Sequence, residues 1–129
     1  MSEIDREEWL QLFVNVTVSV KSLSEIGWGE WSGLQEGAHI AFYVDGIHYD
    51  FAVIECKERI PPGASGPAVF LTLSDALLET GVQIGSLVEL RRGSVVLGHA
   101  HIDGLARVWV VRDRMAEKGY RFSRGPIPV

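Results

Sequence analysis

The sequence predicts an all-β protein in which about six to seven strands form a closed or nearly closed antiparallel barrel. Apolar and polar residues alternate with a period of two over residues 12–22, as in a half-buried strand. Two-residue turn signals, Asp45-Gly46 and Gly93-Ser94, join further apolar runs, and little of the chain has a helical pattern. Closing an antiparallel sheet removes its exposed edges, which favours a barrel.

The N-terminal part predicts a short helix followed by the first strand. Acidic residues follow Ser2, a suitable N-cap, so a short helical lead-in is expected over residues 2–10. The strand at 12–22 should bury one face made of valines, which are Val14, Val16, Val18 and Val20.

The next hairpin is centred on Asp45-Gly46, which favours a type I′ turn. One face of the predicted register pairs apolar residues: Val44 with Ile47, Phe42 with Tyr49 and Ile40 with Phe51. The other face pairs Tyr43 with His48 and Ala41 with Asp50. Apolar positions meet apolar ones on one face, which supports the register independently of the turn.

A later hairpin is centred on Gly93-Ser94, where glycine in the first turn position suits a type II′ turn. The register that follows from this turn pairs Arg92 with Val95, Leu90 with Leu97 and Val88 with His99.

The remaining elements are expected to be short. We predict a strand at 68–73, a helical turn at 76–80 closed by Gly81, and a separate last strand at 107–112. Two prolines near the end argue against a regular element in the tail, residues 113–129. The chain is thus predicted to be a single domain, residues 1–129, with its barrel over about residues 12–112.

Composition restricts the function. The 129 residues carry a net charge of −5, which disfavours sequence-independent binding to nucleic acid. The single cysteine excludes an internal disulfide. No apolar run approaches the ~20 residues of a membrane span, and the acidic start is unlike a signal peptide. We therefore expect a soluble cytoplasmic protein that does not bind membranes.

His99 and His101 lie two residues apart on a predicted strand and therefore share a face. Such a pair needs further ligands to hold a metal, and the available ones, His48, Asp50 and Asp103, are not brought together by their spacing. We expect two partly exposed histidines, with neither a metal nor a cofactor.

Catalytic patterns are otherwise weak. Cys56 follows an apolar strand, where a lone cysteine is more typical of a small buried hydrophobe than of a nucleophile, although the neighbouring Lys57 would favour a thiolate. Phosphate-binding glycine motifs are absent from the sequence. We expect that the chain is not an enzyme.

Two groups of residues could contact a partner. Trp28 and Trp31 lie in the glycine-rich loop 23–37, where tryptophan serves either as a binding anchor or as part of a lid over the barrel end. Basic residues gather in the C-terminal third; they are Arg91, Arg92, Arg107, Arg112, Arg114, Lys118, Arg121 and Arg124. They would form a basic face for an acidic partner or RNA, or remain ordinary solvated side chains.

The run Leu90-Arg91-Arg92-Gly93-Ser94-Val95-Val96-Leu97-Gly98 resembles the L-R-x-G-x-x-V-x-G stretch in the C-terminal β-barrel of the elongation factor Tu family. Upstream, Pro62-Gly63 with the strand 69–73, the run 40–44 with Gly46, and the valine strand at 14–20 resemble further strands of that barrel in the same order. Val95 stands where the family carries arginine, and Glu36-Gly37-Ala38 stands where it carries Y-R-P.

This resemblance implies a six-stranded, Greek-key-like closed barrel that docks onto other molecules and performs no chemistry. The leading hypothesis is a stand-alone, non-catalytic barrel that binds another protein, whose identity the sequence leaves open. The residues expected to contact it are Trp28, Trp31, Arg91, Arg92, His99 and His101. The alternatives are an RNA- or tRNA-binding barrel that uses the basic C-terminal third, and a metal-dependent enzyme that uses the two histidines with a carboxylate.

Overall fold

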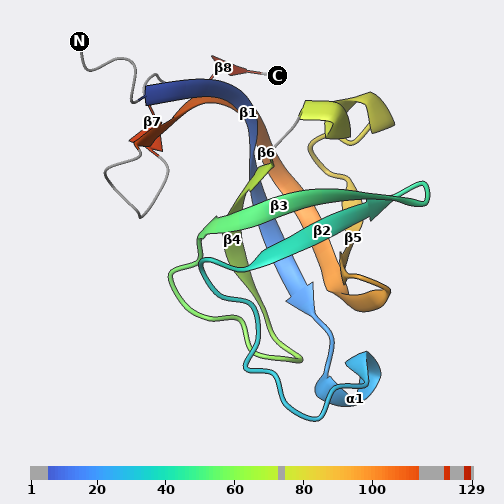
Figure 1. Cartoon of the computed structure of the whole chain (residues 1–129). Helices are drawn as coiled ribbons and strands as arrows, with labels where there is room; N and C mark the ends of the chain where they lie inside the picture. The colour runs from blue at the N-terminus through green and yellow to red at the C-terminus, as the bar shows by residue number, and fades with distance from the viewer. Residues whose placement is uncertain (1–5, 73–74, 114–120, 123–126, 129) are drawn as a thin grey trace.

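A computed structural model describes residues 6–72, 75–113, 121–122 and 127–128 (Figure 1). Its strands are β1 (Arg6–Val20), β2 (His39–Val44), β3 (Ile47–Glu55), β4 (Ser65–Thr72), β5 (Leu87–Arg92), β6 (Val95–Asp113), β7 (Arg121–Phe122) and β8 (Ile127–Pro128). A four-residue helix, α1 (Leu23–Ile26), and a 3-10 helix, η2 (Asp75–Thr80), complete it. Six antiparallel strands follow the order β1-β4-β3-β2-β5-β6 and close through β6 and β1. The predicted all-β, six-stranded closed barrel is confirmed.

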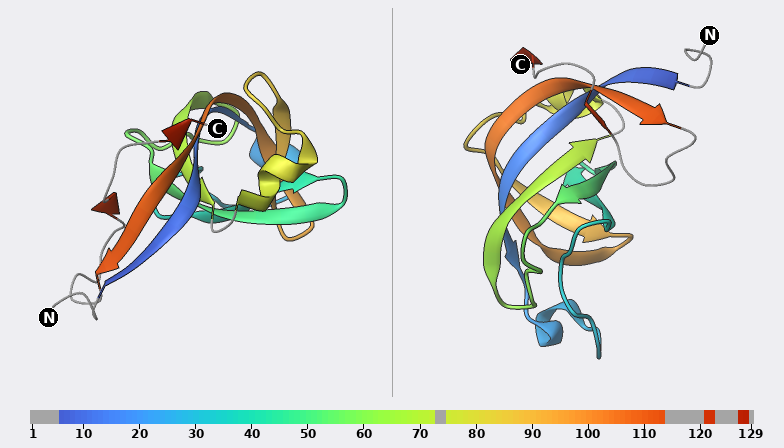
Figure 2. Two further views of the ribbon diagram at one scale, coloured as in Figure 1. Left: turned by 90° about the horizontal axis from the view of Figure 1, so that it is seen from above. Right: turned by 90° about the vertical axis from the view of Figure 1, so that its left-hand side faces the viewer.

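β1 begins earlier than predicted, and the expected helix over residues 2–10 is wrong for residues 6–10. These residues pair with the end of β6, from Arg6 with Asp113 to Leu10 with Trp109. Residues 1–5 lie outside the described chain. The main chain of β6 offers this short segment continuous strand pairing, whereas an isolated helical turn has little intrinsic stability. Figure 2 shows β1 and β6 running together beyond the barrel as a two-stranded ribbon.

The hairpin of β2 and β3 has the predicted turn and the predicted register. Asp45 and Gly46 both have positive φ, 50° and 82°, as a type I′ turn requires. The pairs run from Val44 with Ile47 to Ile40 with Phe51.

The hairpin of β5 and β6 has the predicted turn but only the start of the predicted register. Gly93 has a φ of 60°, and Arg92 pairs with Val95 as expected. Beyond Arg91 the register shifts by one residue, because Leu97 is an extra residue in β6. Leu90 therefore pairs with Gly98, and Val88 pairs with Ala100, so the predicted pairs with Leu97 and His99 are wrong.

The predicted separate strand at 107–112 belongs to β6, which runs without interruption to Asp113. A second register shift occurs where Asn15 pairs with Gly104 and Val16 pairs with Ile102, so Asp103 is a bulged residue. The tail also differs from the expectation: β7 pairs with residues 110–111 of β6, and β8 pairs with residues 106–107. These short strands form because the long β6 offers them a free edge beyond β5.

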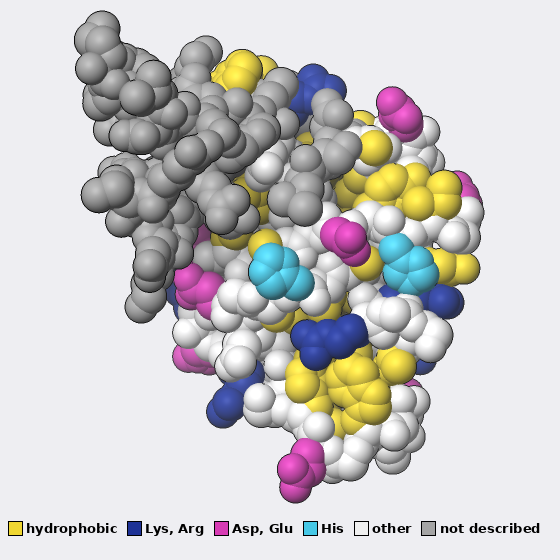
Figure 3. Space-filling view, in the orientation of Figure 1, with side chains coloured by type: hydrophobic (Ala, Val, Ile, Leu, Met, Phe, Trp, Pro, Cys, Tyr) yellow, Lys and Arg dark blue, Asp and Glu magenta, His cyan; other side chains and the backbone are white. Residues whose placement is uncertain are grey.

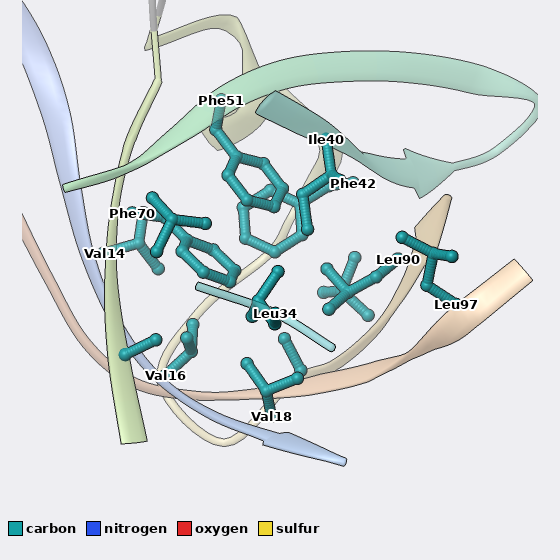
Figure 4. Close-up of a cluster of buried hydrophobic side chains, with 14 of the residues drawn as sticks. Val14, Val16, Val18, Leu34, Ile40, Phe42, Phe51, Phe70, Leu90 and Leu97 are labelled. Atoms are coloured by element: carbon teal, nitrogen blue, oxygen red, sulfur yellow. The ribbon is translucent and has the colours of Figure 1, made fainter. Parts of the chain in front are cut away.

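The interior is filled from all six barrel strands (Figure 4). Phe51 and Phe70 stack with their ring centroids 4.0 Å apart, and Phe42 lies 4.5 Å from Phe51. The predicted valine face of β1 is confirmed, since Val14, Val16, Val18 and Val20 are all buried. Leu34 enters from the loop before β2, where it forms an isolated bridge with Ile60. That bridge closes one end of the barrel, so the 23–37 loop is part of the core.

Gly98 allows the closest approach of β6 to β1. A Cβ atom added at Gly98 would lie 2.0 Å from the carbonyl oxygen of Ser19, far inside contact distance. Gly98→Ala is expected to lower the free energy of unfolding by about 2–3 kcal/mol, because the two strands must separate to admit the methyl group. Urea denaturation measures this change.

Gly29→Ala is the matched control, because Gly29 is exposed and an added Cβ would meet no atom within 4 Å. The control should stay within about 0.5 kcal/mol of the parent protein. Equal losses in the two variants would contradict the close approach of Gly98 to β1.

Candidate functional site

Two tryptophans lie side by side at the end of the barrel that carries α1. Ser22 and Glu25 form a capping box at the start of α1, and Gly27, with a φ of 87°, ends the helix. The chain that follows places Trp28 and Trp31 edge to face, with ring centroids 5.5 Å apart. Both rings are half-buried and pack against the core, so they act as a lid and still present one side to solvent.

Two arginines of β5 stack on aromatic rings from other elements. The guanidinium carbon of Arg92 lies 5.9 Å from the ring centroid of Trp28, and that of Arg91 lies 3.6 Å from the ring centroid of Tyr43. Arg91 also binds the carboxylate of Glu89. Arg92 makes no ion pair with any residue that the structure describes, so its charge is available to a partner.

The hairpin tips are linked beside these arginines. His48, at the start of β3, makes a 2.9 Å hydrogen bond through Nε2 to the carbonyl oxygen of Gly93 in the β5–β6 turn. Because a carbonyl oxygen only accepts, Nε2 carries the proton. The His48 ring also packs edge to face on Tyr43, with centroids 5.0 Å apart. These contacts fix the position of the turn that carries Arg92.

We call this region the aromatic–arginine surface, and it consists of Trp28, Trp31, Tyr43, His48, Arg91 and Arg92. Figure 3 shows a basic side chain lying directly against an apolar patch on this side of the molecule, with histidines nearby. Four of the six residues predicted to contact a partner belong to it. Tyr43 and His48 were not among the residues predicted to contact a partner, although the predicted hairpin register already placed them opposite each other.

The other two predicted contact residues lie elsewhere. His99 and His101 lie on the outer face of β6, where His99 pairs with Glu89 of β5 and His101 pairs with Leu87. His101 Nδ1 lies 2.7 Å from Asp103, whose second carboxylate oxygen accepts a 2.7 Å hydrogen bond from Thr17. Among the described residues, no three His, Cys, Asp or Glu side chains form a group that could hold a metal ion.

Cys56 is buried between the 23–37 loop and the barrel core. Its thiol donates to the carbonyl oxygen of Glu58 at 3.1 Å. Burial, with a smaller effect from the charge of Glu36, raises the pKa of the Cys56 thiol. The thiolate that a nucleophile requires is therefore disfavoured. These observations match the interpretation of Cys56 as a small buried hydrophobe.

The basic C-terminal third is only partly described. Arg91 and Arg92 belong to the aromatic–arginine surface, and Arg107 is half-buried on β6. The side chains of the other predicted basic residues lie outside the described part; they are Arg112, Arg114, Lys118, Arg121 and Arg124.

A comparison with models of known protein families finds no match to this chain, and neither does a comparison with curated protein sequences. Within the described residues, none of the helices has the length and apolar character needed to cross a membrane.

The hydrogen bonds that join Thr17 and His101 to the bulged residue Asp103 should make the stability of the protein depend on pH. Hydrogen bonds from Thr17 and then His101 lower the pKa of Asp103 below its ordinary value of 3.8. Since the folded value is the lower one, this stabilisation is present at neutral pH and is lost as the pH falls below 3.8 and through the folded value. Asp103→Asn should therefore be less stable than the parent at pH 7, with the difference shrinking toward pH 3 in urea titrations.

Asp50→Asn serves as the control, because Asp50 is an exposed carboxylate on β3 with no hydrogen bond to any described residue. Its stability relative to the parent should change less between pH 7 and pH 3. A difference for Asp103→Asn that stays constant over this range would contradict the proposed origin of the shift.

Proposed function

We propose that the chain is a non-catalytic docking barrel that binds a protein partner through the aromatic–arginine surface. The observation that carries this proposal is the stacking of Arg92 on Trp28 at an exposed hairpin turn, without an ion-pair partner among the described residues. The resemblance of residues 90–98 to the C-terminal barrel of the elongation factor Tu family supports a docking role. The proposal includes no cofactor, and it retains the expected cytoplasmic location.

The composition of the surface suits protein recognition. Tryptophan, tyrosine and arginine are the residue types that most often dominate binding energy at protein interfaces. Here the Trp28 ring packs against the core, and the Tyr43 ring contacts His48 and Arg91, so little side-chain freedom remains to be lost on binding. Arg92 would meet a carboxylate or carbonyl group of the partner.

RNA is the second candidate ligand, because aromatic rings next to arginine also stack on unpaired bases. The observation that favours it is the position of Arg91 only 3.6 Å from the Tyr43 ring centroid. The net charge of −5 weighs against it, since phosphate binding benefits from a basic excess.

A photo-crosslinking residue at position 30, between the two tryptophans, should capture the partner in cells of the source organism. The same residue at position 67, an exposed site on β4, which pairs with neither β2 nor β5, provides the control for random encounters. With the captured protein purified, Trp28→Ala and Arg92→Ala should each weaken binding at least about tenfold in calorimetry, as expected for interface anchors. His101→Ala, which lies outside the surface, should leave the affinity unchanged.

Capture from position 67 alone, or equal affinities for all variants, would contradict the proposal. The RNA candidate is measured separately, by the fluorescence anisotropy of labelled tRNA at 50 and 200 mM salt. Binding that several phosphate contacts support should weaken at least about tenfold between these conditions, and it should depend on Arg92.

A further inference from the structure

A second surface with different chemistry lies where β2 and β5 separate. These strands pair only over three positions, from Ala41 with Arg91 to Tyr43 with Glu89. Beyond them, β2 continues into the hairpin tip while β5 leads back to the turn after η2. A hollow of about 570 Å³ opens there, between residues 43–45 on one side and residues 80–82 and 86–89 on the other. We call this hollow the β2–β5 notch.

One exposed apolar side chain lines the notch, and two more lie near its lining residues in the strand pairing or in the sequence. Leu87 lines it and is 68% exposed, Ile47 pairs with the lining residue Val44 and is 54% exposed, and Ile84 lies three residues before Leu87 and is 64% exposed. Only one other large hydrophobic side chain in the described chain, Ile127, is exposed. Leu87 thus gives the notch apolar surface that a partner could cover, with Ile47 next to the lining residue Val44.

The main chain at the notch can accept an extended segment. Pairing between β5 and β2 ends at Glu89, so Leu87 and Val88 have no strand beside them on the β2 side within the described chain. Their other side is occupied by β6. An extended peptide can add its main chain to such an edge, and its side chains then determine which peptide is preferred.

The charges at the notch are acidic. Asp45 and Glu89 line it, Glu79 adjoins the lining residue Thr80, and no lysine or arginine is among the lining residues. Glu89 is already bound by Arg91, which leaves the carboxylates of Asp45 and Glu79 to attract cations. His99 also lines the notch and adds no negative charge.

We infer that the β2–β5 notch binds an extended segment of a partner protein in which apolar residues are flanked by lysine or arginine. The apolar side chains cover Leu87 and Ile47, and the flanking cations lie near Asp45 and Glu79. This site adjoins the aromatic–arginine surface at Tyr43, which belongs to both, but the inference does not depend on the function proposed for that surface.

Two synthetic probes test the inference on the full chain. One peptide has three leucines flanked by two lysines at each end, with both termini blocked; the other has glutamates in place of the lysines. In titrations followed by two-dimensional amide NMR, the lysine peptide should shift signals of residues 44–45 and 86–88 and bind at least about tenfold more tightly than the glutamate peptide. Its affinity should fall as salt rises.

Variants then locate the contact. Leu87→Ser and Asp45→Asn should each weaken the lysine peptide at least about threefold, and neither should unfold the protein, since Leu87 is largely exposed and asparagine suits a type I′ turn. Arg92→Ala should bind this peptide as the parent does. Equal binding of the two peptides, signal shifts centred on Trp28 and Arg92, or no localised shifts would overturn the inference.

Discussion

The pairing of β1 with β6 is the constraint on which the rest of the structure depends. It extends along all of β1, from Arg6 with Asp113 to Val20 with Gly98, and it closes the sheet into a barrel. Only a residue without a side chain fits where Gly98 faces the Ser19 carbonyl group. Because closure pairs β1 with β6, which would otherwise be the two sheet edges, each of the six barrel strands lies between two neighbours over part of its length.

β6 pairs with β5 along one edge and with β1 along the other, and each of these two pairings contains one register shift. The extra residue Leu97 adjusts β6 to β5, and the bulge at Asp103 adjusts it to β1. A bulge increases the local twist and redirects the chain. The β5–β6 turn that follows from this path brings Gly93 to His48, and with it places Arg92 against Trp28. The aromatic–arginine surface is thus a consequence of how the barrel closes.

The sequence was informative where local chemistry decides structure. Asp45-Gly46 determined both a turn and a register, because both residues accept positive φ. The prediction of a separate strand at 107–112 was wrong, because β1 continues beside residues 103–104 and keeps β6 continuous through a bulge at Asp103. Likewise, Trp28 and Arg92 are 64 positions apart in the sequence, and a local hydrophobic pattern does not indicate that two such distant residues meet. The sequence allowed Trp28 and Trp31 to be proposed as contacts for a partner, but it did not indicate which residues of the same chain lie beside them.

Several polar side chains in the described part of the barrel bind one another or the main chain. His101, Asp103 and Thr17 satisfy one another, Arg91 binds Glu89, and the Cys56 thiol donates to a main-chain carbonyl group. Such pairing holds side chains in place and stabilises the strands that carry them. Other side chains that face solvent include the half-buried ring of Trp28, the aliphatic side chain of Leu87, and Arg92, which has no ion-pair partner among the described residues. These groups gain free energy when another surface covers them, which supports the proposed binding of a protein partner.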